Sequence, residues 1–288
     1  MPMAGLRFIV NTRSGGGQGA ALGAALAPFG PVAPIQELDR VLAAAEPGDR
    51  LIAIGGDGTA AAVIEAAAGR WAVGVVPVGT GNDLARALGW PLRLGDPARR
   101  AAALAAAPVA PMRRCRIAGG GLSRSFCLYL SLGWDAAVAG RFHAWREAHP
   151  GWFRSAAGNK AIYAAAGLAT RAPVLAATVD GESAAAAGSL LFLAVPSYAG
   201  GALPPEPQIL AQHRLPAGIG FAWARLRAAA WRAWGDRDGY DLELAAALPA
   251  QVDGEPFVLP AGRYRVSVSG QAWGLAGPAG RMEAIPAP

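Results

Sequence analysis

The stretch LIAIGGDGTAAA, residues 51–62, decides the fold of the N-terminal part of the chain. An apolar run typical of a buried strand stops at two glycines and an aspartate, and an alanine-rich segment typical of a helix follows. The same order of strand, glycine-rich turn and helix surrounds it, with strands in LRFIV (6–10) and WAVGVVPVG (71–79). Strands that alternate with helices indicate parallel βαβ units, so we expect an α/β domain with a parallel sheet.

Three glycine-rich turns follow these three strands. They are NTRSGGGQG (11–19), GGDGT (55–59) and PVGTGND (77–83). The carboxyl ends of parallel strands lie along one edge of a sheet, where ligands bind. Glycines let backbone amides approach an anion closely, and a helix N-terminus adds partial positive charge. The turns together predict a phosphate cradle. The alternative is that each glycine run is only a tight connection between a strand and a helix.

Asp57 is an unexpected residue for a phosphate cradle, because its carboxylate repels phosphate unless a cation lies between them. Mg²⁺ prefers oxygen ligands and keeps several waters, which makes such a carboxylate useful. The alternative is a carboxylate that only caps the following helix or closes the turn. The chain lacks the GxxxxGK[ST] pattern of a P-loop, and GGGQGA fits a dinucleotide-binding turn poorly.

Bulk properties favour a folded protein of two domains. The chain has 288 residues, above the size of about 250 at which single cores stop growing. It is 53% hydrophobic with a net charge of +6, which suits anionic partners such as nucleotides or membrane surfaces without choosing between them. Cys115 and Cys127 have no zinc-ligand spacing, so we expect two buried thiols. The N-terminus does not resemble a signal peptide, and the longest apolar stretch is shorter than the roughly 20 residues of a membrane span. We expect a cytoplasmic protein.

After about residue 111 the pattern changes to strand-like segments between turn residues. The segments are RRCRIAG, SRSFCLYLSLGW, VLAATVDG, GSLLFLAVPS, QVDGEPFVLP and RYRVSVSG. Helices are expected at NKAIYAAAGLATR and AWARLRAAAWRAW. Short strands joined by turns favour an antiparallel β-sandwich. We therefore predict an α/β nucleotide-binding domain over residues 1–111 and a β-sandwich domain over residues 112–288, whose C-terminal tail can pack with either domain.

Several stretches resemble, in order, the diacylglycerol kinase catalytic family, and specifically its bacterial soluble lipid kinases. NTRSGG is similar to the family's Asn-Pro-x-Ser-Gly, GGDGT is its signature, and VGVVPVGTGNDLARALG is similar to its third motif. SLGWDAAV resembles its Gly-Phe-Asp-Ala turn, and QVDGEPF falls where the family has Asp-Gly-Glu. The resemblance implies an α/β nucleotide domain and a β-sandwich with the active site in the cleft. It implies a lipid kinase that uses ATP and Mg²⁺ and phosphorylates a hydroxyl of diacylglycerol or a similar lipid.

The resemblance also implies roles for individual residues. The ATP-binding residues would be Asn11, Thr12, Arg13, Ser14, Gly15, Gly55, Gly56, Asp57, Gly58, Thr59, Gly79, Thr80 and Asn82. Asp57 and Asp83 would belong to the magnesium network. Glu255, with Asp253 beside it, would take the proton from the lipid hydroxyl. This is coherent chemistry, because phosphoryl transfer needs positioning, charge neutralisation and one carboxylate near the attacking hydroxyl. Taken alone, DGE is also an ordinary hairpin turn.

Some positions depart from the family pattern. Ala61 and Ala62 stand where the family carries Asn-Glu, Arg113 and Arg114 stand where an acidic residue is expected, and Ala217 stands where a second magnesium site has Asp. The alternative function is therefore a weakened or inactive relative that binds nucleotide or lipid without phosphoryl transfer. NAD kinases share the GGDGT turn, but PVGTGNDLAR resembles the lipid-kinase form.

A basic, tryptophan-rich helix is predicted over residues 221–234. A projection at 100° per residue places Trp223, Trp231 and Trp234 on one side. Such a face either lies in a membrane interface or packs on the sandwich. The first interpretation implies peripheral contact with the inner membrane face. We expect a lipid substrate and no nucleic-acid partner, and the family resemblance implies a homodimer as one oligomeric state.

Overall fold

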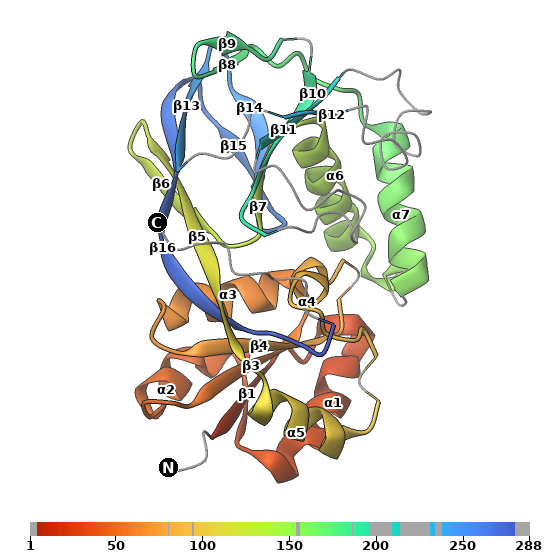
Figure 1. Cartoon of the computed structure of the whole chain (residues 1–288). Helices are drawn as coiled ribbons and strands as arrows, with labels where there is room; N and C mark the ends of the chain where they lie inside the picture. Colours follow the sequence, from red (N-terminus) through yellow and green to blue (C-terminus); the bar gives the residue numbers. More distant parts are fainter. Residues whose placement is uncertain are drawn as a thin grey trace. The chain divides into compact units, whose positions relative to one another are not determined.

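A computed structural model describes residues 5–79, 81–93, 95–153, 156–185, 187–195, 209–213, 231–233 and 238–279 (Figure 1). The chain divides into two compact units. Unit 1 comprises Met1–Arg113 and Gly270–Pro288, and unit 2 comprises Arg114–Ser269. Two long strands, β5 (Val109–Gly119) and β16 (Gly262–Leu275), contribute residues to each unit. The C-terminal end of β16 is therefore part of unit 1.

Unit 1 is built on a parallel sheet. Its strands follow the order β2 (Val32–Pro34), β1 (Leu6–Val10), β3 (Arg50–Gly55), β4 (Ala72–Pro77) and the end of β16, and each neighbouring pair is parallel. Residues Leu51 to Ile54 of β3 are fully buried. Helices cover both faces of a parallel sheet, which is why its strands are apolar throughout. Here α1 (Gln18–Leu26) packs beside α5 (Pro97–Ala106), and α2 (Leu38–Ala43) packs beside α3 (Asp57–Ala67).

Hydrogen bonds from side chains cap both ends of helix α5. The Asp96 side chain accepts the N–H of Arg99 at 2.9 Å, and Pro97 occupies the first helical position. At the other end, the Arg50 guanidinium donates to the carbonyl oxygens of Leu104 and Ala107, which have no partner within the helix. These bonds fix α5 to β3. The Leu104 side chain is completely buried.

Unit 2 is a sandwich of two antiparallel layers. One layer contains β9 (Glu182–Ser183), β8 (Ala177–Val179), β13 (Gly239–Leu244), the first part of β16, and the pair of β5 with β6 (Leu122–Phe126). The other has the order β12 (Trp231–Ala233), β11 (Ile209–His213), β10 (Ala187–Leu193), β7 (Tyr129–Gly133), β14 (Leu248–Val252) and β15 (Glu255–Leu259). A single apolar core joins side chains of both layers, including Cys115, Leu130 and Tyr240.

Helices complete the two units. The short helix α4 (Asp83–Ala87) follows β4 in unit 1. In unit 2, α6 (Trp134–Ala148) packs on β14, β15 and α7 (Ala156–Ala169). The fold class predicted from the sequence, an α/β parallel-sheet domain and an antiparallel β-sandwich, is confirmed. Cys115 and Cys127 are buried, as expected. Within the part of the chain that the structure describes, no helix is long and apolar enough to cross a membrane.

Three sequence predictions were wrong in detail. Residues 123–134 form two strands, β6 and β7, separated by a turn at Cys127 and Leu128. Helix α6 was not predicted, because its buried side chains are confined to its first turns and its second half is exposed or half-buried. Residues 231–233 form strand β12 where a helix was predicted, so the helical projection does not hold for Trp231. The rest of residues 221–234, and Ala217, lie outside the described residues.

The α5 contact predicts a stability change in unit 1. Replacing Leu104 with Ala should lower the free energy of unfolding by about 2–5 kcal/mol, because the vacated space lies among packed side chains that cannot fully close it. Val109→Ala is the matched control in the same unit. Its side chain is 49% exposed, so the change should stay within about 0.5 kcal/mol. Urea denaturation followed by circular dichroism measures both, and equal effects would contradict the packing described here.

Candidate functional site

The turn after β1 follows a course that requires glycine. Gly15, Gly16 and Gly17 all have left-handed φ values, of 62°, 68° and 97°. Asn11 fixes the start of the turn, because its side-chain oxygen accepts the N–H of Arg13 at 3.1 Å. Thr12 and Arg13 are exposed, and Ser14 is half-buried. The backbone of this turn is therefore accessible to a ligand.

The three glycine-rich turns meet in unit 1. A Cβ added at Gly15 would lie 2.5 Å from Val78 Cγ1, and one added at Gly79 would lie 2.6 Å from Gly56 Cα. Such distances leave no room for a side chain, so glycine is needed where the turns touch. The Asn11 side chain also donates to Thr59 Oγ at 3.2 Å. The structure thus brings Asn11 and Gly15 of the first turn close to residues of the second and third turns, and Gly56 of the second close to Gly79 of the third. Thr80 lies outside the described residues.

Asn82 holds the third turn closed. Its side-chain amide donates to the Gly79 carbonyl oxygen at 2.8 Å, and its side-chain oxygen accepts the Gly79 N–H at 2.9 Å. Its φ of 55° is one that asparagine tolerates better than most residues. Both polar atoms of this side chain are therefore used within the turn, and Asn82 fixes the course of its backbone.

Asp57 and Asp83 converge at Gly81. A Cβ added at Gly81 would lie 2.9 Å from Asp57 Oδ2 and 3.5 Å from Asp83 Oδ2. The other oxygen of Asp57 accepts the N–H of Leu84 at 3.0 Å, which ties the second turn to the start of α4. Burial, and then the charge of Asp83, raise the pKa of Asp57 from an ordinary value of 3.8 to about 6. Gly81 was missed by the sequence analysis, although it is the second glycine of the VGTGND stretch.

The donor set at Gly81 fits one kind of metal ion. Among the described residues, no group of three or more His, Cys, Asp or Glu side chains is arranged to hold a metal. This excludes a complete protein cage for zinc from that part of the chain. Mg²⁺, by contrast, is commonly held by one or two carboxylates together with waters and substrate phosphates. The close pair Asp57 and Asp83 meets that requirement, and a cation there would relieve their mutual repulsion.

In unit 2, Asp253 lies at the turn between β14 and β15 with a φ of 50°. Its carboxylate accepts the N–H groups of Cys127, Leu128 and Tyr129, each at 2.9 Å. The Cys127 thiol lies 3.5 Å from Oδ2. Burial raises the pKa of Asp253, and the N–H donors act in the opposite direction. Asp253 therefore joins the β14–β15 turn to the turn between β6 and β7.

Glu255 begins β15 and is exposed. It lies beside α6, where Gly140 leaves room for Pro256: a Cβ at Gly140 would be 3.8 Å from Pro256 Cβ. His143 stands one helical turn further along α6. Burial and the charge of Arg146 lower the pKa of His143, and Glu255 raises it by a smaller amount. The structure thus gives Glu255 an accessible carboxylate with a histidine nearby, a neighbour that sequence reasoning missed.

A buried polar cluster lies next to this turn and was also missed. Ser131 donates to Asp135 at 2.8 Å, Gln251 donates to both Ser131 and Asp135, and the Asp135 N–H donates to Ser189 at 3.0 Å. These residues come from β7, α6, β14 and β10. The sequence signal was a serine and an aspartate inside the apolar stretch SLGWDAAV. The cluster fixes the start of α6 relative to the strand that leads into the Asp253 turn.

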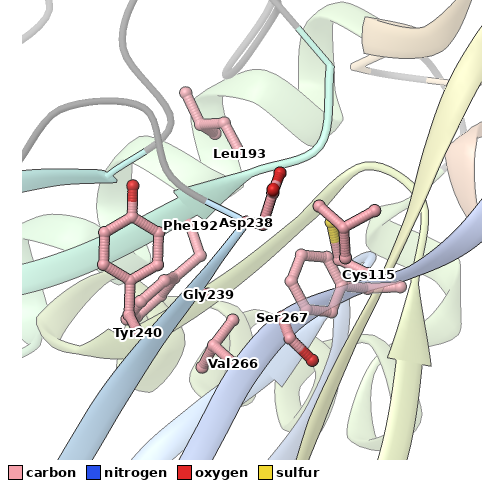
Figure 2. A pocket seen from close by; sticks show the side chains of 10 residues that line it. Cys115, Phe192, Leu193, Asp238, Gly239, Tyr240, Val266 and Ser267 are labelled. Carbon is pink, nitrogen blue, oxygen red and sulfur yellow. The ribbon is translucent and has the colours of Figure 1, made fainter. Parts of the chain in front are cut away.

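An apolar hollow opens in the sandwich of unit 2 (Figure 2). Its free volume is about 20 Å³, room for little more than one water molecule. Its walls come from β5, β6, β10, β13 and β16, and Phe192 and Tyr240 meet there with ring centroids 6.1 Å apart. The lining residues are Cys115, Phe126, Phe192, Leu193, Asp238, Gly239, Tyr240, Val266, Ser267 and Val268. Such walls suit an apolar group.

The positions that depart from the family pattern are placed as follows. Ala61 is buried in α3, while Ala62 is exposed on the same helix. Arg113 and Arg114 are half-buried in β5, and both already have interaction partners. None of the four adds a carboxylate to the Asp57–Asp83 pair, so any cation there would rest on these two acidic side chains and on groups brought by a ligand.

Two family models match consecutive parts of the chain. Residues 5–116 match the diacylglycerol kinase catalytic domain, and residues 125–207 match the diacylglycerol kinase accessory domain. Diacylglycerol kinase zeta of Rattus norvegicus is 31% identical over 274 residues, which covers 77% of this chain and 29% of the relative. Diacylglycerol kinase 1 of Arabidopsis thaliana is 29% identical over 270 residues, covering 78% and 37%. The chain thus spans about a third of the length of these relatives.

Solved structures show the same fold. A crystal structure of a diacylglycerol kinase from Bacillus anthracis aligns with a TM-score of 0.61 at 15% identity, covering 97% of this chain and 99% of the other. Another crystal structure from that bacterium aligns with a TM-score of 0.67 at 17% identity, covering 97% of each chain. Two adjoining domain matches and a shared fold along the chain lead to one conclusion: the protein belongs to the diacylglycerol kinase family.

Proposed function

We propose that the protein is a lipid kinase, which transfers the γ-phosphoryl group of ATP to a hydroxyl of diacylglycerol or a similar lipid in a Mg²⁺-dependent reaction. The observation that carries the proposal is the convergence of Asp57 and Asp83 at Gly81, among three touching glycine-rich turns. A phosphate cradle that contains two carboxylates is poorly suited to phosphate alone, and well suited to phosphate with a divalent cation. Membership of the family supports the choice of acceptor.

Unit 1 supplies the nucleotide site in this proposal. Backbone N–H groups in the first turn of a helix have no partner within the helix, and those at the start of α3 include Asp57, Gly58 and Thr59. They offer donors to the phosphates. In the turn from Asn11 to Gly15, the N–H groups of Asn11, Arg13 and Ser14 already have acceptors within the protein, so the start of α3 is the main source of donors in this proposal. Thr80 is proposed as a further nucleotide contact. Asn82 would fix the shape of the third turn by holding Gly79.

Asp57 and Asp83 would hold the cation. Bound Mg²⁺ would neutralise charge on the phosphates and so favour phosphoryl transfer. Because the pKa of Asp57 is raised to about 6, its carboxylate is ionised above that pH and protonated below it. The pair is therefore ready to bind a cation at neutral pH, and it weakens as a cation site in acid.

Glu255 would act as the general base. In the proposed step the lipid hydroxyl oxygen forms a bond to the γ-phosphorus, the bond from that phosphorus to the oxygen of ADP breaks, and the hydroxyl proton passes to Glu255. An exposed carboxylate at the start of a strand is accessible to such a substrate.

A lipid acceptor lies in a membrane, so the proposal includes contact of the protein with a lipid surface. The homodimer implied by the family is a separate proposal that light scattering tests.

Transfer of labelled γ-phosphate to a panel of extracted lipids tests the proposed reaction. Glu255→Gln should lower kcat by about 10² to 10⁴, because it removes the proton acceptor while keeping the shape of the side chain. The chain offers a matched control, since Val179-Asp180-Gly181-Glu182 repeats the sequence Val252-Asp253-Gly254-Glu255 at another hairpin of unit 2. Glu182→Gln should leave kcat within about twofold. Saturable ATP binding without lipid product would instead identify a non-catalytic relative.

The raised pKa of Asp57 predicts how binding of Mg²⁺·ATP depends on pH. At pH 7.5, Asp57→Asn should weaken binding about tenfold or more, since Asn still accepts the Leu84 N–H but carries no charge. At pH 5 the wild-type carboxylate is mostly protonated, so the ratio of the two affinities should approach one. ATP also takes up a proton in this pH range. Because this affects both proteins equally, the ratio of the wild-type to the Asp57→Asn affinity is free of it. Calorimetry measures both proteins, and a ratio independent of pH would contradict the assignment.

A further inference from the structure

We infer that Asp253 is a positioning residue, which anchors the turn that carries Glu255, and that the proton of the lipid hydroxyl goes to Glu255 alone. The inference rests on the proposed function and refines its catalytic site. It replaces the expectation that the two neighbouring acidic residues, Asp253 and Glu255, share the catalytic step.

The surroundings of the Asp253 carboxylate leave it no capacity for a substrate proton. Oδ1 accepts the N–H groups of Leu128 and Tyr129, and Oδ2 accepts the N–H of Cys127 and faces its thiol. Each oxygen therefore already has two donors, which is about the number of lone pairs available on a carboxylate oxygen. The residue is only 8% exposed. A general base must reach the proton that it removes, and this side chain is almost wholly buried.

The same contacts fix the position of Glu255. The Asp253 N–H donates to the Tyr129 carbonyl oxygen at 2.9 Å, so the turn is bonded to the start of β7 by its backbone as well. Asp253 and Gly254 have φ values of 50° and 91°, and they bring Val252 of β14 opposite Glu255 of β15. Because both strands and the turn are held by hydrogen bonds, the position of the Glu255 backbone is fixed.

The second Val-Asp-Gly-Glu sequence shows that the motif alone does not create this arrangement. Asp180 also has a left-handed φ, of 49°, and its carboxylate accepts the Asp241 N–H at 2.8 Å. Asp180 is exposed, however, whereas Asp253 is buried beneath the β6–β7 turn. Two hairpins with the same four turn residues thus differ in what surrounds the aspartate. Only Asp253 is buried against backbone donors from another hairpin.

Amide hydrogen exchange tests the anchoring without any need for activity. Asp253→Asn should speed the exchange of the Cys127, Leu128 and Tyr129 amides about tenfold or more, because an Asn side chain offers one acceptor oxygen where the carboxylate offers two. Glu255→Gln should leave these three amides unchanged, and Asp180→Asn should affect only the amide of Asp241. Unchanged exchange at residues 127–129 in Asp253→Asn would overturn the anchoring.

A double variant distinguishes a positioning residue from a base. If Asp253 acts only by holding Glu255, Asp253→Asn should lower kcat in the wild-type background but leave kcat within about twofold in the Glu255→Gln background. An equal further loss of kcat in the double variant would overturn the inference. If Asp253→Asn does not fold, Cys127→Ala removes one donor only and should speed exchange at residues 127–129 about two- to threefold. No change in that variant would count against the anchoring. Absence of lipid product from the wild type would refute the proposed function, while the exchange data would still decide the role of Asp253.

Discussion

The close approach of two carboxylates, Asp57 and Asp83, is the constraint on which the rest of unit 1 depends. Burial of the Asp57 carboxylate, and then the like charge of the buried Asp83, oppose folding unless a proton or a cation relieves them, and the pKa of about 6 for Asp57 expresses that cost. The contact between Asp57 and the Leu84 N–H holds the carboxylate in place nonetheless. Glycine is needed where the turns touch, because a side chain there would push the turns apart and separate the two carboxylates.

Unit 2 uses a buried carboxylate in a related way. Asp253 collects backbone donors from a turn more than a hundred residues earlier in the chain, as Asp57 collects one from the start of α4. Each aspartate thereby fixes a turn beside an acidic residue to which we assign chemistry, Asp83 in one unit and Glu255 in the other. Placing such a group on a firmly held turn reduces the reorganisation needed when a substrate binds.

Much of unit 1 could be predicted from the sequence, because buried parallel strands are apolar throughout and end at glycine-rich turns. Unit 2 was harder. Helix α6 was not predicted because only its first turns are fully buried, so its apolar period is short. Residues Trp231–Ala233 form a strand, whereas the helix predicted there rested only on the spacing of the tryptophans. The role of Asp253 could not be predicted, since its donors are distant in sequence and the same four residues at 179–182 lack that environment.

The central claim is that Asp57 and Asp83 form a cation site for a nucleotide. A titration of the Asp57 carboxyl carbon by ¹³C NMR, with and without Mg²⁺ and ADP, tests it most directly. The account predicts a pKa near 6 for Asp57 in the free protein, and a pKa that falls toward the ordinary value of 3.8 when both ligands are present. Mg²⁺ and ADP that bind to the protein and leave the pKa of Asp57 unchanged would contradict the claim.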